Sequence, residues 1–449
     1  MNLVRLAALI LLAASLGAAQ QHRIAEADRL AREVREEFLH AWNGYKTYAW
    51  GTDGLLPLSK KGYVTYGGPL LLTPVDAFDT MLLMGLTAEA EETKRLILSS
   101  LTFDQDISVK NFEIVIRVLG GLLTAHQMTG EPRFLSLAED LGRRLLPVFD
   151  SPTGLPYVNV NLRTGAVERT HTNPAETGTL LIEFGTLSKL TGNDVYYKKA
   201  KRALTETFRR RSAIGLAGES FDARTGKWIG TDSHVGGMID SYYEYLYKCW
   251  KLFGDEECRT MWDESIAAVN RYCADTVRGM FWYARVDMNT GRRRHRVFGG
   301  LEAFMPGLLA LSGDTARAAA LQRSCEAMWN RYGVEPEMYD YAADSVRYGR
   351  YPLRPEIIES AYYLYRITGD TAYQHMGASF FRALRRHCRT EAGYAELADV
   401  VTKRQHDMME SFFLAETMKY CYLLFADPSL IDLRSVVFNT EAHPIRKSW

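Results

Sequence analysis

Carboxylic acids recur at comparable places along this chain, most of them one to two dozen residues before a small residue that ends a helix-like segment. An acid in the first turn of a helix is favoured by the helix dipole by about 0.3–1 kcal/mol, which is the simplest explanation of any one of them. Several, however, have aromatic and apolar neighbours, as in NFEIVI, IDSYYEY and MMESFF. Carboxylates buried in one cavity must shift their pKa values apart or bind a cation. The series comprises Asp76, Asp79, Glu113, Glu176, Asp240, Glu302, Glu356 and Glu410.

Glycoside hydrolysis is a reaction that uses such a set of acids. One protonated carboxyl assists the leaving oxygen, and one ionised carboxylate attacks the sugar or activates a water. The chain is 12% aromatic, with 25 Tyr and 8 Trp, and flat amphipathic rings suit sugar faces, although core packing accounts for most of them. The residues alone therefore predict a carbohydrate-active enzyme.

A repeat in the sequence defines the elements that must position these acids. Amphipathic segments end in a small residue and a polar turn, which is typical of helix C-termini. After the first interval the marks are roughly 56 to 62 residues apart, enough for two helices and two connections. Seven helical hairpins fit an open solenoid or a closed α/α barrel, and we expect closure because neither end shows a polar capping repeat. The marks are Gly85, Gly130, Gly192, Gly254, Gly313, Gly369 and Ala426.

The N-terminal sequence MNLVRLAALILLAASLGAAQ predicts a signal peptide over residues 1–19, cut after Ala19, and hence a secreted or periplasmic protein. Its apolar run is short for a membrane span, which requires roughly 20 residues, and a type II anchor is the alternative. No Pro/Gly/Ser-rich linker interrupts the remainder. We therefore expect residues 20–449 to form a single catalytic domain.

Charge and cysteine content narrow the range of partners. Lys and Arg together number 54, as do Asp and Glu, which argues against nucleic acid and anionic membranes. The cysteines form no CxxC pair and have no histidine at metal spacing, so a zinc site is not expected, and their disulfide pairing stays open. The six cysteines are Cys249, Cys258, Cys273, Cys325, Cys388 and Cys421. We expect a monomer.

Long phrases of the chain resemble a known family in the family's order. They run from FLHAWNGYKTYAWGTDGLLP through FEIVIRVLGGLL, DSYYEYLYK, LRPEIIESAYYLYRITGD and MESFFLAETMKYCYLLF to VFNTEAHP. The family is the class I α-1,2-mannosidases, glycoside hydrolase family 47. The resemblance implies an all-α (α/α)7 barrel closed at one end by a C-terminal β-hairpin. It also implies an exo-acting, calcium-dependent enzyme that removes terminal α-1,2-linked mannose from oligosaccharides with inversion.

The resemblance also assigns roles to residues. Glu113 matches the general acid, which acts directly or through a water, and Asp240 matches a second catalytic carboxylate. Glu356 matches the general base, and inversion implies roughly 6.5–9.5 Å between it and the acid. Thr440 matches the ligand of Ca²⁺. Residues matching the family's mannose pocket are Arg117, Glu176, Met238, Arg354, Glu410 and Glu441. Truncation of VVFNTEAHP should abolish activity.

Some positions depart from the eukaryotic pattern. Gly54 replaces an acid, and Gly299 and Gly300 replace an Asp-His pair, which should reshape the leaving-group side of the pocket. Ala303 replaces a disulfide cysteine whose partner matches Cys325, so the family's disulfide should be absent. Met238 stands where endoplasmic-reticulum members have Arg and Golgi members have Leu, which favours trimming of several branches.

Three other functions compete with this one. The first is a family member that binds mannose-rich glycans with little hydrolysis, and the second is an α/α-barrel glycosidase for another linkage. The third is a helical scaffold without an active site. Retention of the catalytic carboxylates and Thr440 favours the enzyme.

Overall fold

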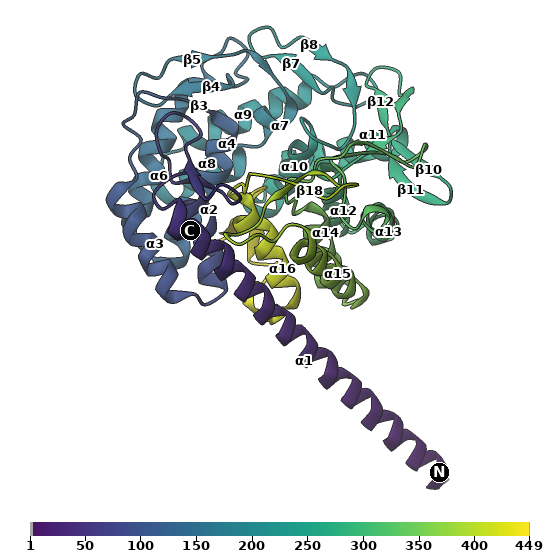
Figure 1. Ribbon diagram of the computed structural model, residues 1–449. Coiled ribbons are helices and arrows are strands. Elements are labelled where there is room, and N and C mark those ends of the chain that lie inside the picture. Colours follow the sequence, from purple (N-terminus) through teal and green to yellow (C-terminus); the bar gives the residue numbers. More distant parts are fainter. Residues whose placement is uncertain (1–2, 449) are drawn as a thin grey trace.

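The computed structural model describes residues 3–448, with side chains from residue 24 onward. The side chains of the predicted signal peptide, residues 1–19, lie outside the described residues. The backbone of the first helix, α1 (Leu3–Tyr48), extends from the body in Figure 1. No helix within the described part of the chain is both long enough and apolar enough to cross a membrane.

Helices pack in pairs along the chain, and the pairs form the ring seen in Figure 1. The last pair joins the two ends of the sequence, because α16 packs on α1. This arrangement is an α/α barrel, as the repeat predicts. The pairs are α2 (Leu72–Leu83) with α3 (Thr87–Ser100), α5 (Gly120–Thr129) with α6 (Pro132–Leu145), α8 (Leu181–Thr191) with α9 (Val195–Arg209), α10 (Asp240–Phe253) with α11 (Glu256–Tyr272), α12 (Met305–Leu311) with α13 (Thr315–Tyr332), α14 (Glu356–Thr368) with α15 (Ala372–His387), and α16 (Met418–Phe425) with α1.

Burial distinguishes the two helices of a pair. In α2 every residue except Leu82 is buried, whereas its partner α3 buries only the stripe of Ala90, Thr93 and Ile97. A helix buried on all sides belongs inside, and an amphipathic helix covers it from outside. The first helix of the pair therefore forms the inner wall, and the second forms the outer layer.

The glycines that mark the repeat end the inner helices. Gly130, Gly192, Gly254 and Gly369 are C-caps in the left-handed conformation, with φ between 71° and 73°. Gly accepts this conformation because it has no Cβ to clash. The sequence prediction of these helix ends is confirmed.

Short helical segments precede, interrupt or follow the longer helices. Two of them, η1 (Val115–Leu119) and η4 (Phe413–Thr417), are π-helical turns, which are rare and cluster at functional sites. The others are α4 (Asn111–Ile114), η2 (Leu146–Phe149), α7 (Pro174–Gly178), η3 (Leu301–Phe304) and η5 (Pro428–Leu430).

The connections carry short antiparallel strands, which the sequence patterns did not reveal individually. They form eight separate sheets of two or three strands. The bounds are β1 (Gly54–Leu56), β2 (Lys61–Tyr63), β3 (Ser108–Lys110), β4 (Asn159–Asn161), β5 (Val167–Glu168), β6 (His171–Thr172), β7 (Ser220–Asp222), β8 (Trp228–Gly230), β9 (Asp232–Ser233), β10 (Ala274–Val277), β11 (Met280–Tyr283), β12 (Arg285–Asp287), β13 (Arg293–His295), β14 (Val297–Phe298), β15 (Met338–Asp340), β16 (Ser345–Tyr348), β17 (Glu396–Asp399), β18 (Arg404–His406), β19 (Val436–Phe438) and β20 (Pro444–Arg446).

The structure settles the cysteine pairing. Cys249 near the end of α10 is bonded to Cys258 in α11, across the turn between the two helices. Cys325 is buried and free, so the predicted absence of the family's disulfide is confirmed. Asp255 lies close to both bonded sulfurs, but bonded cysteines offer no thiolate to a metal.

Candidate active site

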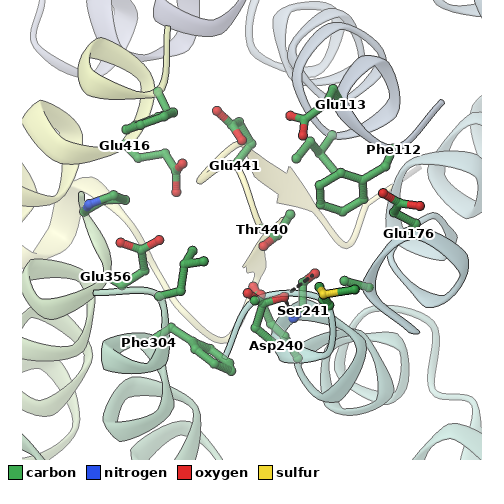
Figure 2. A pocket seen from close by; sticks show the side chains of 18 of the residues that line it. Phe112, Glu113, Glu176, Asp240, Ser241, Phe304, Glu356, Glu416, Thr440 and Glu441 are labelled. Atoms are coloured by element: carbon green, nitrogen blue, oxygen red, sulfur yellow. Dashed lines mark hydrogen bonds between the residues drawn. The ribbon is translucent and has the colours of Figure 1, made fainter. Parts of the chain in front are cut away.

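A cavity of about 380 Å³ lies where the starts of the inner helices meet, and acidic side chains point into it from several elements (Figure 2). Nine of the ten residues predicted for the site line it. They are Glu113, Arg117, Glu176, Met238, Asp240, Arg354, Glu356, Thr440 and Glu441. The chain from residue 113 to residue 441 therefore contributes to a single pocket. Of the eight acids in the sequence series, Glu113, Glu176, Asp240 and Glu356 line it, whereas Asp76, Asp79, Glu302 and Glu410 do not.

Glu410, the tenth residue, does not line this cavity. Its carboxylate instead accepts a hydrogen bond from the Tyr63 hydroxyl at 3.2 Å. Glu410 precedes the π-helical turn η4, and the residues around that turn that reach the cavity are Phe412 and Glu416. The sequence located the right segment but not the residue that faces the pocket.

Three carboxylates of the cavity were missed in the sequence: Glu244, Glu359 and Glu416. Glu244 follows Asp240 by four residues and Glu359 follows Glu356 by three, so each lies one helical turn further down the same face. This spacing of three or four residues is the sequence signal that could have identified Glu244 and Glu359. The lining thus holds eight carboxylates against three cations, Lys110, Arg117 and Arg354.

Glu113 is held by two of these cations. Its carboxylate accepts hydrogen bonds from Arg117 at 3.0 and 3.1 Å, and Lys110 lies 3.6 Å away. Burial alone would raise the pKa of Glu113, but Arg117 and Lys110 more than offset this and lower it. Glu113 is therefore ionised in the protein without substrate.

The pKa values of Asp240 and Glu356 are raised, whereas that of Glu113 is lowered. Burial, together with the Glu244 and Glu302 charges, raises the pKa of Asp240 to about 6 against the hydrogen bond from the Ser241 amide. Burial raises the pKa of Glu356 to about 8, because Arg354 offsets only part of the effect. One carboxyl oxygen of Glu356 is buried without a partner among the described residues. Both groups hold a proton more readily than Glu113 does.

Met238 reaches the pocket from a strained position. Its φ of 78° lies in the left-handed region, which is unusual for a residue with a side chain, and 42% of its surface is exposed. Its carbonyl accepts a hydrogen bond from the Ala175 amide at 2.9 Å. That bond connects the start of α7, which carries Glu176, to the loop before Asp240.

The C-terminal hairpin β19–β20 brings Thr440 and Glu441 into the pocket from its turn (Figure 2). The Glu441 carboxylate pairs with Arg117. Beneath them, Asn439 donates hydrogen bonds to the carbonyl of Ile116 at 2.9 Å and to Glu183 at 2.8 Å. The turn is thus fixed to two inner walls of the barrel.

The backbone is crowded where the family has its Asp-His pair. A Cβ built on Gly299 would lie 2.0 Å from the carbonyl oxygen of Glu337, and one built on Gly300 would lie 3.2 Å from Arg354 and 3.6 Å from the Glu335 carboxylate. Glu335 is fully buried, and neither of its oxygens has a hydrogen-bond partner among the described residues. Burial, Glu356 and Glu337 raise the pKa of Glu335 well above its usual range. Gly299 and Gly300 are not among the residues that line the cavity, and the reshaping of its leaving-group side expected from them stays a prediction.

Comparison with known proteins places the chain. Alpha-mannosidase I MNS5 of Arabidopsis thaliana is 38% identical over 96% of this chain and 79% of its own length. Human ER degradation-enhancing alpha-mannosidase-like protein 2 is also 38% identical, over 92% of this chain and 76% of its own. The structure of an alpha-1,2-mannosidase from Trichoderma reesei superposes with a TM-score of 0.87 at 26% identity, covering 93% of this chain and 99% of that one. The model of glycosyl hydrolase family 47 matches residues 37–447, and this protein belongs to that family.

Proposed function

We propose that this protein is an exo-acting α-1,2-mannosidase that hydrolyses terminal α-1,2-linked mannose with inversion and requires calcium. The observation that carries the proposal is the convergence of Glu113, Asp240, Glu356 and Thr440 on one acidic cavity. The names of the related proteins, which include alpha-1,2-mannosidases, support the linkage.

Glu356 is the proposed base that deprotonates the attacking water. It begins α14, and Arg354 lies 3.9 Å from its carboxylate. Glu113 is the proposed acid. Lys110 and Arg117 keep it ionised without substrate, so it must take up a proton from solvent when sugar contacts weaken these ion pairs. It then passes that proton to the leaving oxygen, which we assign to a transfer through a bound water. Asp240 is the second catalytic carboxylate.

The donor set fits calcium. Ca²⁺ takes six to eight oxygen ligands, and the cavity offers the Thr440 hydroxyl and surplus carboxylates without a cysteine or histidine. Thr440 would bind the ion, with the carboxylates of Glu356, Glu416 and Glu441 nearby. When bound, calcium supplies positive charge that favours ionised carboxyls and accepts water and sugar hydroxyls as ligands.

Three further points complete the proposal. The helix pairs form an (α/α)7 barrel, and the β19–β20 hairpin closes one end of it. Removal of the first 19 residues as a signal peptide delivers the protein outside the cell or to the periplasm. Met238, an apolar residue at the mouth, permits trimming of more than one glycan branch.

The test is proton NMR of the purified protein with α-1,2-mannobiose, following the anomer that is released first. Initial β-mannose that disappears on chelation supports the linkage, the inversion and the calcium requirement. Initial α-mannose would contradict inversion, because release of the α anomer from an α linkage is retention, which proceeds through a covalent intermediate. Binding of mannose-rich glycans without cleavage would instead indicate a lectin.

A further inference from the structure

The structure contains a second cavity, outside the proposed active site, whose lining is strongly basic. It has a volume of about 560 Å³ and lies between the sheet of β9, β12 and β13 and the sheet of β14, β15 and β16. Four arginines and a histidine line it, against a single carboxylate. These residues are Arg285, Arg294, His295, Arg296, Arg347 and Asp340.

Carboxylates behind the lining orient the guanidinium groups. Arg296 donates through Nε to Asp275 at 3.0 Å, and Arg285 donates through Nη2 to Glu302 at 3.3 Å. Asp275 and Glu302 are themselves buried. Ion pairs of this kind hold the planar guanidinium in one orientation, so that less entropy is lost when it binds an anion.

The arginines retain unused donors. Among the hydrogen bonds of the described residues, Arg296 uses only Nε, and Arg347 uses Nε and Nη2, both on Asp340. About half of each of these two side chains is exposed, 46% and 58%. A guanidinium with free terminal N–H groups binds phosphate, sulfate or carboxylate through paired hydrogen bonds.

This basic cavity adjoins the leaving-group side of the active site. Val297 lines the basic cavity, and Leu301, four residues later, lines the active site, so the two cavities are at most about 14 Å apart along this segment. Glu302 forms part of the wall between them, because it pairs with Arg285 and approaches Gly236, the neighbour of the lining residue Gly237. A glycan seated in the active site would have to pass over Glu302 to reach the basic cavity.

We propose that the basic cavity is an anion subsite for the glycan, and that the preferred substrate carries an oxyanion on a sugar beyond the scissile linkage. The inference rests on the proposed function for its substrate, but the subsite itself can be tested without cleavage. The oxyanion is a phosphate, a sulfate or a uronic acid carboxylate, which share the same recognition by paired N–H donors.

The first experiment measures binding of inorganic phosphate by ³¹P NMR titration of the full chain. The double variant Arg296→Gln/Arg347→Gln should weaken binding at least about tenfold, since two charge-assisted contacts are lost. Arg434→Gln is the control, because Arg434 is exposed and pairs with Asp432 elsewhere. Equal affinity of all three proteins, or no binding to any, would overturn the subsite.

The second experiment compares kcat/KM for two oligosaccharides with the same terminal α-1,2 linkage, one carrying a phosphate on its reducing-side sugar. We expect kcat/KM to be about tenfold higher for the phosphorylated glycan because its KM is lower. This difference should be lost in the double variant and should shrink at high salt, where charges are screened. Sulfated and glucuronic-acid-bearing glycans in the same assay identify which oxyanion is preferred. Equal cleavage of neutral and charged glycans would contradict the inference and leave the mannosidase intact. Failure to cleave any of them would contradict the proposed function, and phosphate binding would then decide the subsite alone.

Discussion

The imidazole Nδ1 of His443 lies 2.7 Å from the carboxylate of Asp79, and both side chains are buried. His443 belongs to the turn between β19 and β20, whereas Asp79 is in α2. Lys419 reinforces the contact, because it lies 2.7 Å from Asp79 and donates to the carbonyl of Ala442. The turn that carries Thr440 and Glu441 is thereby fastened to the opposite end of the sequence.

This contact predicts a pH-dependent stability. Burial by itself lowers the pKa of His443, but Asp79 and Asp76 raise it from 6.5 to about 9. A raised histidine pKa gives stability that is complete below about pH 6.5 and is lost as the pH rises through about 9, on the order of 3 kcal/mol. Thermal unfolding between pH 6 and 9.5 should therefore show a falling Tm that is flatter in His443→Gln. Parallel profiles for the two proteins would refute the assignment.

Replacement of the proposed base separates binding from chemistry. Glu356→Gln keeps the size of the side chain but cannot accept the proton of water, so we expect kcat to fall by about 10²–10⁴ while mannobiose still binds. Calorimetry and turnover measurements check this. Glu391→Gln, at an exposed carboxylate that pairs with Lys60, is the control. Full activity of Glu356→Gln would rule out the mechanism.

The roles of Glu113 and Asp240 can be distinguished by changing the leaving group of the substrate. An acid is dispensable when the leaving group departs without a proton, so Glu113→Gln should recover activity on a mannoside with an acidic phenol as leaving group, relative to its activity on mannobiose. Asp240→Asn should show no such recovery. The ratio of kcat/KM on the two substrates is the measurement, and the reverse pattern would transfer the acid role to Asp240.

Calcium binding should depend on the Thr440 hydroxyl. Thr440→Val removes one oxygen ligand, and we expect the Kd for Ca²⁺ to rise at least about tenfold, or 1.4 kcal/mol. Calorimetry on the protein stripped by chelator measures this without any substrate. Thr260→Val, on the exposed face of α11, should bind as the natural protein does. Unchanged affinity in Thr440→Val would place the ion elsewhere.

Much of the fold and site could be predicted because both follow the repeat. Gly130, Gly254 and their counterparts marked the ends of the inner helices, and acids at equivalent helix starts then had to converge. The misses have separate causes. Glu410 lies before the π-helical turn η4 and its carboxylate accepts a hydrogen bond from Tyr63, whereas Glu416, within η4, reaches the cavity. The basic cavity was invisible in sequence because Arg296 and Arg347 are brought together only by strand pairing.

Because the β19–β20 hairpin completes the pocket, the pocket can form only late in the synthesis of these residues. A chain made from its N-terminus folds its early parts first, yet Thr440 and Glu441 follow the last inner helix, α16, in the sequence. The ribosome must therefore complete the chain as far as Arg446, at the end of β20, before the hairpin can dock against Asp79 and Glu183. A partial chain that ends before Thr440 lacks two residues that line the cavity, so the pocket is completed only after all the helices of the ring have been made.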